Sequence, residues 1–181
     1  KSLYSKVNPS GKLNETYPIY YEDTPAYAYY PSKERSSEYR ESLYVGYRYY
    51  TTVGKSTRFP FGYGLSYTTF EYKDLKIDTE GVTFTIKNTG NMSGTEIAQL
   101  YVGKSSETVF RPVRELKGFV RVELQPGEEK EVRIGFDDKT FRFYDTRTDS
   151  WEIESGTYQI MIGENAQQMV LEGALDVKTE C

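Results

Sequence analysis

The sequence predicts a mainly β protein, in which an antiparallel two-sheet sandwich follows an extended, mostly irregular aromatic strap. One observation behind this prediction is that 15 of the 18 tyrosines precede residue 73. The other is that apolar and polar residues alternate with a period of two after residue 69, as they do in half-buried strands. We therefore expect two parts, residues 1–68 and residues 69–181.

Residues 1–57, called the strap, fit neither the helical nor the strand period. Turn signals interrupt them at Asn8-Pro9-Ser10-Gly11, Tyr17-Pro18, Thr24-Pro25 and Tyr30-Pro31. Tyrosine has a large apolar body and a polar tip, so a segment rich in tyrosine and poor in aliphatic residues is suited to cover another surface. We expect that surface to lie outside this sequence, and the strap of the isolated chain to be poorly ordered or self-associated.

Residues 58–67, called the junction, contain Pro60, Gly62 and Gly64, which exclude a helix. Four aromatic side chains in the same ten residues can anchor the segment. We expect a fixed corner between strap and sandwich. The alternative is a flexible linker, which would be rich in Gly and Ser or in Pro and would lack aromatic anchors.

The period of two after residue 69 predicts a series of short strands. They are expected at Phe70–Ile77, Val82–Ile86, Ile97–Val102, Val120–Leu124, Val132–Phe136, Phe141–Tyr144, Tyr158–Ile162 and Leu171–Val177. Turns separate them at 78–81, 88–91, 125–128 and 154–156. This pattern favours a sandwich of about seven strands. We expect Trp151 and Ile153 to enter its core from one edge.

Composition excludes several classes of function. A net charge of -4 and a pI near 5.1 give no excess positive field, so we expect neither a nucleic-acid nor a membrane partner. No apolar run reaches the length of a membrane span, and no signal peptide is visible at the N-terminus. The absence of histidine removes Ser-His-Asp and Cys-His catalysis and most zinc sites.

The cysteine content bears on the compartment. Cys181 is the single cysteine, so internal disulfides, a disulfide-bridged antibody-type sandwich and cysteine-rich metal sites are excluded. This usage favours a reducing, cytoplasmic location and leaves a periplasmic or secreted one open.

Without histidine, a pair of carboxylates acting as general acid and nucleophile is the best enzymatic hypothesis from the residues alone. Acids lie among aromatic residues that could stack on sugars at Glu22-Asp23, Glu34, Glu38 and Glu41. Catalytic groups must be held rigidly, and this region shows no scaffold, so we interpret these acids as solvated or interfacial.

Three further patterns have simpler interpretations. Asp137-Asp138 and Asp145–Asp149 lack the spacing of a calcium loop and are expected to be ordinary loop acids. The triplets Asn14-Glu15-Thr16 and Asn91-Met92-Ser93 fit the glycosylation sequon, which matters only in a secreted eukaryotic protein. The arginines that stand among aromatics are expected to stack on rings and pair with carboxylates across a domain contact; they are Arg40, Arg48, Arg58 and Arg111.

Four stretches, taken together and in order, resemble glycoside hydrolase family 3, the family of bacterial and fungal beta-glucosidases and beta-xylosidases. The first is Asn8–Leu13 with Glu15–Pro18, and the second is Tyr39–Tyr50. The third is Phe59–Phe70, and the fourth is Arg111–Phe119. Ser42-Leu43 departs from the Gly-Ile that members often have, and Asn14 departs from a frequent Pro.

The resemblance implies a retaining exo-glycosidase in which two carboxyls lie about 5 Å apart. It implies that residues 1–68 are the tail of an alpha/beta sandwich domain plus an interdomain strap, and that residues 69–181 are a fibronectin type III-like domain. In the family the nucleophilic aspartate lies on a (beta/alpha)8 barrel and the acid/base glutamate of the glucosidases on the alpha/beta sandwich domain. Neither motif is present, so we assign no catalytic, substrate-binding, cofactor-binding or metal residue and expect no cofactor.

The leading hypothesis is a C-terminal accessory portion of a beta-glucosidase-like enzyme, inactive alone, that braces the catalytic barrel and the alpha/beta sandwich domain. The intact enzyme would act on a beta-glucoside. The rival hypothesis is a free-standing carbohydrate-binding β-sandwich module whose strap tyrosines stack on glycans.

Overall fold

The structure, a computed structural model, describes residues 7–32, 35–36, 38–106 and 109–179. Glu34 and Cys181, both weighed in the sequence analysis, lie outside the described residues.

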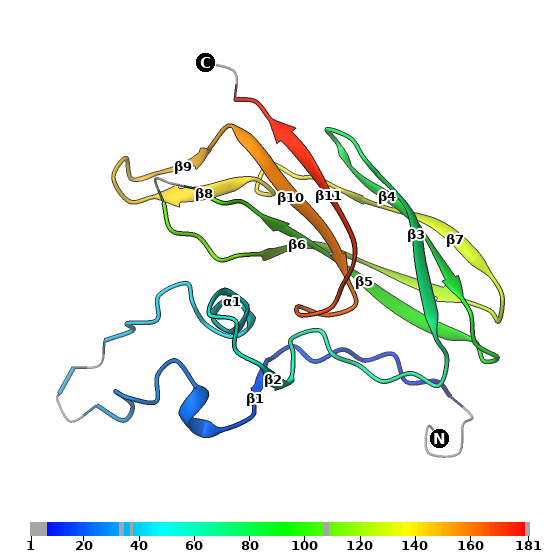
Figure 1. The fold of residues 1–181 in the computed structure, drawn as a ribbon, viewed down its shortest axis with the longest axis horizontal. Coiled ribbons are helices and arrows are strands. Elements are labelled where there is room, and N and C mark those ends of the chain that lie inside the picture. Colours follow the sequence, from blue (N-terminus) through cyan, green and yellow to red (C-terminus); the bar gives the residue numbers. More distant parts are fainter. Residues whose placement is uncertain (1–6, 33–34, 37, 107–108, 180–181) are drawn as a thin grey trace.

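In the described part of the chain, two antiparallel sheets face each other as a sandwich of seven strands (Figure 1). The three-stranded sheet has the order β3-β4-β7, with β3 at Phe70–Ile77, β4 at Gly81–Asn88 and β7 at Glu129–Gly135. The four-stranded sheet has the order β11-β10-β5-β6, with β11 at Met169–Val177, β10 at Gly156–Gly163, β5 at Gly94–Gly103 and β6 at Glu115–Leu124. The predicted antiparallel sandwich is confirmed.

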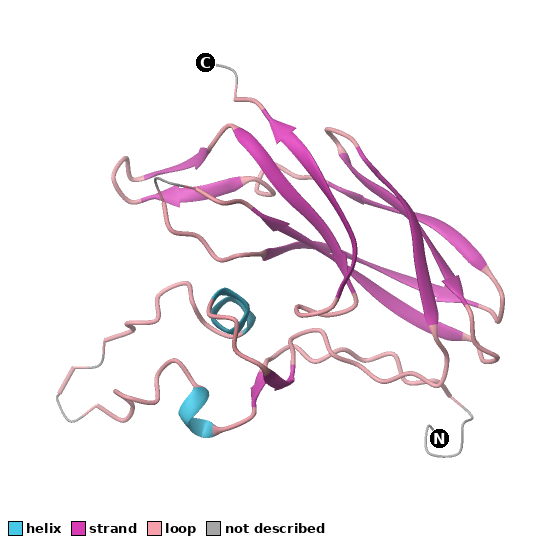
Figure 2. Cartoon of the chain, viewed as in Figure 1, coloured by secondary structure: helices cyan, strands magenta, loops and turns pink. Residues whose placement is uncertain are grey.

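The core lies between the two sheets and is made by the inward residue of each alternating pair. Val82, Phe84 and Ile86 of β4 are fully buried, as are Leu100 of β5 and Ile160 of β10. Each such side chain contributes roughly 1.5–3 kcal/mol when it leaves water. The alternation seen in the sequence therefore corresponds to a single continuous core, and Figure 2 shows that strands make almost all of this region.

Buried Asn88, at the end of β4, ties together the loops at one end of the sandwich. Its side-chain amide donates hydrogen bonds to the carbonyls of Met92 (2.8 Å) and Leu124 (3.1 Å), and its Oδ1 accepts from the hydroxyl of Thr68 (2.5 Å). Its backbone carbonyl accepts from Gly127, whose φ of 76° suits the turn between β6 and β7. A fully satisfied amide can be buried at low cost, so one residue fixes three loops.

The hairpin of β8 (Arg142–Asp145) and β9 (Ser150–Ile153) forms a separate two-stranded sheet, and it corrects one prediction. Trp151 does not enter the core, because its side chain is 65% exposed; Ile153 is half-buried. The hairpin is not part of either sheet of the sandwich. Successive side chains along its strands therefore point alternately to the protein and to solvent.

The strap contains regular structure that its sequence period did not predict. A short strand β1 (Tyr17–Pro18) pairs with β2 (Thr57–Phe59), a 3-10 turn covers Tyr21–Asp23, and a helix α1 spans Tyr47–Thr52. Six residues are too few for a helix that is stable alone, so tertiary packing must stabilise α1. The expectation of a strap without helix or strand is therefore wrong at these positions.

Replacing Asn88 by Asp should show how much the loops depend on this amide. The change keeps the shape of the side chain but removes both donors and places a carboxylate against two carbonyl oxygens. We expect the free energy of unfolding in urea at pH 7 to fall by about 3 kcal/mol or more. The matched control is Asn91→Asp at an exposed position of the same loop, where a change within about 0.5 kcal/mol is expected. Equal effects of both variants would contradict this account.

Candidate docking surface of the strap

The first described residues of the strap run alongside the junction and are bonded to it. The backbone N–H of Leu13 donates to the carbonyl of Tyr63, and the N–H of Gly62 donates to the carbonyl of Leu13, both at 2.8 Å. The Asn8 side chain accepts from the N–H of Tyr67 (2.9 Å) and donates to the carbonyl of Ser93 (3.0 Å). The junction is therefore ordered against strap and sandwich, as expected of a fixed corner.

A buried charge cluster holds this part of the strap on the edge of the sandwich. The Lys12 ammonium lies 2.9 Å from Oε1 of Glu96, with 16% and 7% of the two side chains exposed. The hydroxyl of Tyr72 donates to the same oxygen at 3.1 Å. Lys12 comes from the strap, Glu96 from β5 and Tyr72 from β3, so one cluster joins the strap to both sheets.

Two pKa values reflect the low polarity of this cluster. Burial, and then the negative charge of Glu96, raises the pKa of the Glu164 carboxyl, and Lys12 only partly opposes the rise. Burial also raises the pKa of Tyr72 far above its ordinary value, with the neighbouring Glu96 adding to the effect. Tyr72 therefore remains a neutral donor, and ionised Glu164 opposes folding.

Helix α1 covers the outer face of the four-stranded sheet (Figure 1). Tyr47 and Tyr50, three residues apart on one face of the helix, are buried. The Tyr47 ring lies 5.8 Å from that of Tyr101, and its hydroxyl accepts a hydrogen bond from the N–H of Leu116 at 2.8 Å. For Tyr47 the expectation of a surface outside this sequence is wrong, because the sheet of the same chain is the surface that it covers.

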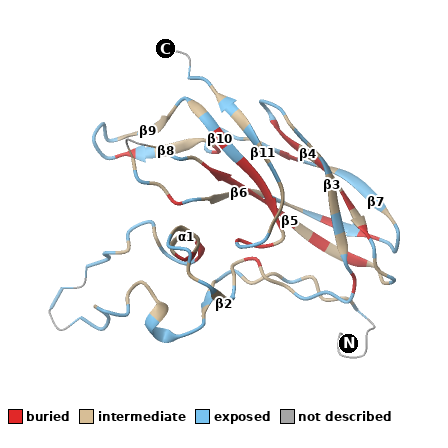
Figure 3. Cartoon of the chain, viewed as in Figure 1, coloured by how far each residue is buried: buried red, intermediate tan, exposed pale blue. Residues whose placement is uncertain are grey.

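Many other aromatic residues of the strap are exposed, and Figure 3 colours much of the segment as exposed. An open apolar groove of about 520 Å³ lies where strap and junction meet. Its lining residues are Pro9, Gly11, Leu13, Tyr17, Phe59, Tyr63, Gly64 and Leu65. Leu65 is 69% exposed and Tyr17 is 47% exposed. A contiguous exposed apolar surface of this kind is a candidate interaction site.

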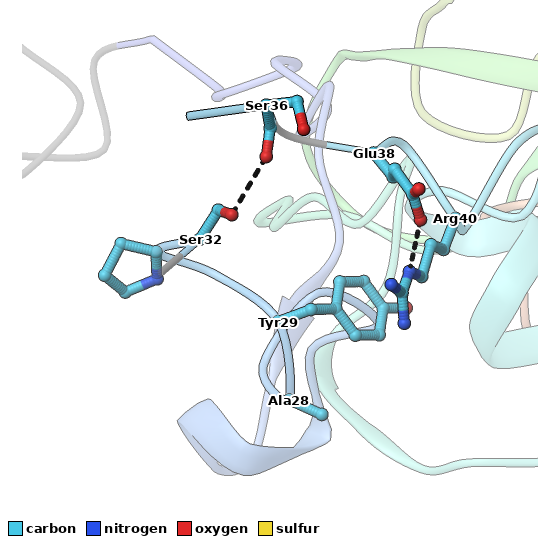
Figure 4. Close-up of a pocket in the computed structure, with 7 residues that line it drawn as sticks. Ala28, Tyr29, Ser32, Ser36, Glu38 and Arg40 are labelled. Atoms are coloured by element: carbon cyan, nitrogen blue, oxygen red, sulfur yellow. Dashed lines mark hydrogen bonds and ion pairs between the residues drawn. The ribbon is translucent and has the colours of Figure 1, made fainter. Parts of the chain in front are cut away.

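A second, polar hollow of about 280 Å³ lies within the strap (Figure 4). The guanidinium of Arg40 lies 5.4 Å from the centre of the Tyr29 ring, and its Nε is 2.9 Å from the carboxylate of Glu38. Ser32 donates to the carbonyl of Ser36 nearby (3.0 Å). The two charges in this hollow neutralise each other, and these contacts join residues 29–32 of the strap to residues 36–40.

Three of the four singled-out arginines stack on a ring and pair with a carboxylate, but only Arg48 does so between strap and sandwich, because the partners of Arg40 lie in the strap and those of Arg111 in the sandwich. Arg48 lies over the Tyr47 ring at 5.3 Å and pairs with Glu115 at 3.3 Å. Arg111 lies 3.8 Å from the centre of the Phe143 ring and pairs with a glutamate on the loop before β10. Arg40 stacks and pairs as described, and Arg58 is exposed.

The singled-out strap acids are spread along the segment. Lys55 holds the carboxylate of Asp23 at 2.9 Å and, through a hydrogen bond, keeps its pKa below the ordinary value. Glu38 is taken by Arg40, Glu22 is exposed and Glu41 is half-buried. No described pair of these acids lines a common pocket in the manner of a glycosidase.

The loop acids also bind cations or donors of the chain itself. Arg147 pairs with Asp145 at 2.7 Å, and its hydrogen bond lowers the pKa of that carboxyl to about 2. Arg142 pairs with Asp138 at 3.0 Å, and the carboxylate of Asp137 accepts from Thr140. Of the sequon asparagines, Asn14 and Asn91 are both exposed. Within the described ranges, no three acids or cysteines gather as metal ligands, and no helix has the length and apolarity to cross a membrane.

Sequence reasoning missed Lys12, Glu96 and Glu164, although one signal was available. Glu96 has the same parity along β5 as the core residues Ala98 and Leu100, so its side chain points inward. A buried carboxylate requires a cationic partner, so the inward position of Glu96 predicts a lysine or arginine beside it. Nothing in the sequence identified Lys12 as that lysine.

Comparison with known proteins places these features in a family. Residues 96–166 match the fibronectin type III-like domain family. The chain is 44% identical over 98% of its length to thermostable beta-glucosidase B of Acetivibrio thermocellus, and 45% identical over 97% to probable beta-glucosidase K of Emericella nidulans. The crystal structure of the Bifidobacterium adolescentis GH3 beta-glucosidase superposes with a TM-score of 0.91 over 97% of this chain, at 34% identity.

The chain belongs to glycoside hydrolase family 3, as its C-terminal fibronectin type III-like region. It spans only 24% and 21% of the two curated relatives and 27% of the crystallised chain. Each of these relatives is thus several times longer than this family 3 region and matches it over only a part of its length.

Replacing Lys12 by Met should test the buried pair in this family 3 region. Met preserves the alkyl stem but leaves Glu96 buried without a cation, so the free energy of unfolding should fall by about 3–5 kcal/mol. Adding Glu96→Gln to the variant should restore a large part of the loss, because no unpaired charge then remains. Denaturant unfolding of the three proteins checks this, and a single variant as stable as the native chain would refute it.

Replacing Glu164 by Gln should change how stability depends on pH. The folded-state pKa of Glu164 is raised, so its contribution is fully present below the unfolded-state pKa and is lost as pH rises through the folded-state pKa. The Gln variant cannot ionise, so it should be more stable than the native chain at pH 7 and no more stable at pH 3.5. Urea unfolding at both pH values measures the difference; a constant difference would contradict the raised pKa.

Proposed function

We propose that this chain is the C-terminal accessory portion of a retaining beta-glucosidase-like enzyme and braces its catalytic domains. Residues 1–68 then form the tail of an alpha/beta sandwich domain together with an interdomain strap, and residues 69–181 form the fibronectin type III-like domain. The partners are the (beta/alpha)8 barrel and the alpha/beta sandwich domain of the same enzyme. The observation that carries the proposal is the apolar groove between strap and junction.

The composition of the groove favours a protein partner over a sugar. Its lining is aliphatic and aromatic, and no charged side chain contributes to it. A glycan needs hydrogen-bonding groups beside the aromatic rings, whereas the centre of a protein interface is depleted of charge and enriched in Tyr and Phe. The strap therefore supports bracing better than the rival hypothesis of a glycan-binding strap.

The positions of the strap carboxylates determine which domains the proposal makes catalytic. A retaining glycosidase needs two carboxyls about 5 Å apart, one to form the glycosyl-enzyme intermediate and one to transfer protons. The strap acids that the structure describes are exposed, half-buried or bound to cations of the chain, so the proposal assigns both carboxyls to other domains. The substrate of the intact enzyme is a terminal beta-D-glycoside, and this region contributes rigidity.

Leu65→Asp should test bracing in the longer parent enzyme. Burying a carboxylate in an apolar domain contact should destabilise the parent by about 2–5 kcal/mol, seen as a lower midpoint of thermal unfolding. In the isolated chain Leu65 is solvent-exposed, so the same change should stay within about 0.5 kcal/mol. The control is Ala174→Asp at an exposed position on β11, which should be neutral in both proteins.

The isolated 181-residue chain should show no turnover of an aryl beta-glucoside. Turnover above the blank would refute the assignment of the carboxyls to other domains. An equal response of the parent enzyme to Leu65→Asp and Ala174→Asp would refute bracing through the groove.

A further inference from the structure

A second group of exposed aromatics lies on the β8–β9 hairpin. Tyr144 and Trp151 are direct cross-strand partners, and their rings lie 5.4 Å apart with planes at 73°. The side chains are 44% and 65% exposed. Trp151 is the single tryptophan of the chain, and the core does not use it.

The hairpin is held firmly from its other face. Phe143 points to the protein, where the Arg111 guanidinium lies 3.8 Å from the centre of its ring. Arg111 in turn binds the carboxylate of Glu154 at 2.7 Å, directly after β9. In the loop between the strands, Arg147 binds buried Asp145. The aromatic pair is therefore presented in a fixed orientation, which lowers the entropy cost of binding a ligand.

Polar groups border the aromatic pair on its solvent side. Arg142 shares the face of Tyr144, two residues away on β8, and pairs with Asp138 at 3.0 Å. At the other end the hydroxyl of Tyr144 donates to the carboxylate of Asp149. Arg142 keeps unused N–H donors, and the two carboxylates keep acceptor positions. Apolar ring faces bordered by paired donors and acceptors match the surface of a pyranose, which has apolar C–H faces and a rim of hydroxyls.

We propose that the β8–β9 hairpin is a glycan-binding site. A pyranose of a β-linked glucan packs one face on the Trp151 indole, with the edge of Tyr144 against its side. Its hydroxyls bind the Arg142–Asp138 pair and Asp149. The choice of a β-linked glucan rests on the proposed function, whereas the site itself rests on the hairpin.

Position and size favour a glycan over a protein partner. Figure 1 shows the hairpin at the end of the molecule opposite the first described residues and away from β1 and β2, whose residues Tyr17 and Phe59 line the apolar groove. A specific protein interface buries about 800 Å² on each partner, with an apolar centre. Two rings bordered by charges are too small an apolar area for that purpose and suffice for one or two sugar units.

The single tryptophan makes the site directly observable. Titrating the 181-residue chain with cellohexaose should give a saturable change in tryptophan fluorescence, because the only reporter is in the site. Trp151→Ala should weaken binding at least about tenfold by calorimetry, and Trp151→Phe, which keeps an aromatic face, should recover part of it. The matched control is Phe119→Ala, which removes a comparably exposed ring (67%) from the outer face of β6 and should bind like the native chain.

Three results would overturn the proposal: no saturable response up to the solubility limit of cellohexaose, equal losses in the Trp151 and Phe119 variants, or binding by the isolated chain that is absent in the longer parent. The last result would show that another domain covers the hairpin. Bracing is measured by thermal unfolding of the Leu65 variant and glycan binding by calorimetry, so either can fail without the other.

Discussion

The buried contact of Lys12 with Glu96 is the interaction on which the arrangement of the chain depends. It joins the strap to β5, and the Tyr72 hydroxyl on the same carboxylate adds β3. A buried ion pair gains little over a well-packed apolar pair, because the cost of removing both charges from water offsets their attraction. Its value is specificity, since any placement of the strap that separates the partners leaves a buried charge alone. The sandwich is therefore ordered by burial of apolar area, whereas the strap around Lys12 is positioned by avoidance of an unpaired charge and α1 by packing on the sheet.

This difference determines how much the sequence could predict. The bounds of β3 agree with the expected Phe70–Ile77, because a strand with one buried face shows its period directly. Helix α1 has no such period, since its six residues depend on the sheet beneath them. Trp151 was misplaced because apolar character alone does not reveal whether a strand lies in the sandwich or in a projecting hairpin. The cluster around Glu96 needed a contact 84 residues apart along the chain, which no local pattern contains.

Aromatic residues have three roles in this chain, and their neighbours distinguish these roles. Tyr47 is buried, and its hydroxyl accepts a backbone hydrogen bond from β6, so it acts as part of the fold. Phe59 borders a groove without charged side chains, which suits another apolar protein surface. Trp151 packs against Tyr144, and the Arg142–Asp138 ion pair lies at the start of the same hairpin. This combination suits a ligand with both C–H faces and hydroxyls. The number of tyrosines along the chain indicates that aromatic residues cover surfaces, but it does not distinguish these three roles.

In the proposed bracing function, docking of a domain on the groove is thermodynamically linked to the charge cluster. Gly11 and Leu65 line both the groove and a small hollow that also contains Lys12 and Glu96, so a partner docked on the groove would shield the Lys12–Glu96 contact further from water. Further loss of water strengthens the attraction between the paired charges and increases the cost of ionising Glu164 beside them. A partner that binds only the docked strap stabilises the docked strap by the same free energy. In the proposed bracing function, the strap therefore couples a docked domain to both sheets of the sandwich, which is the mechanical requirement of a brace.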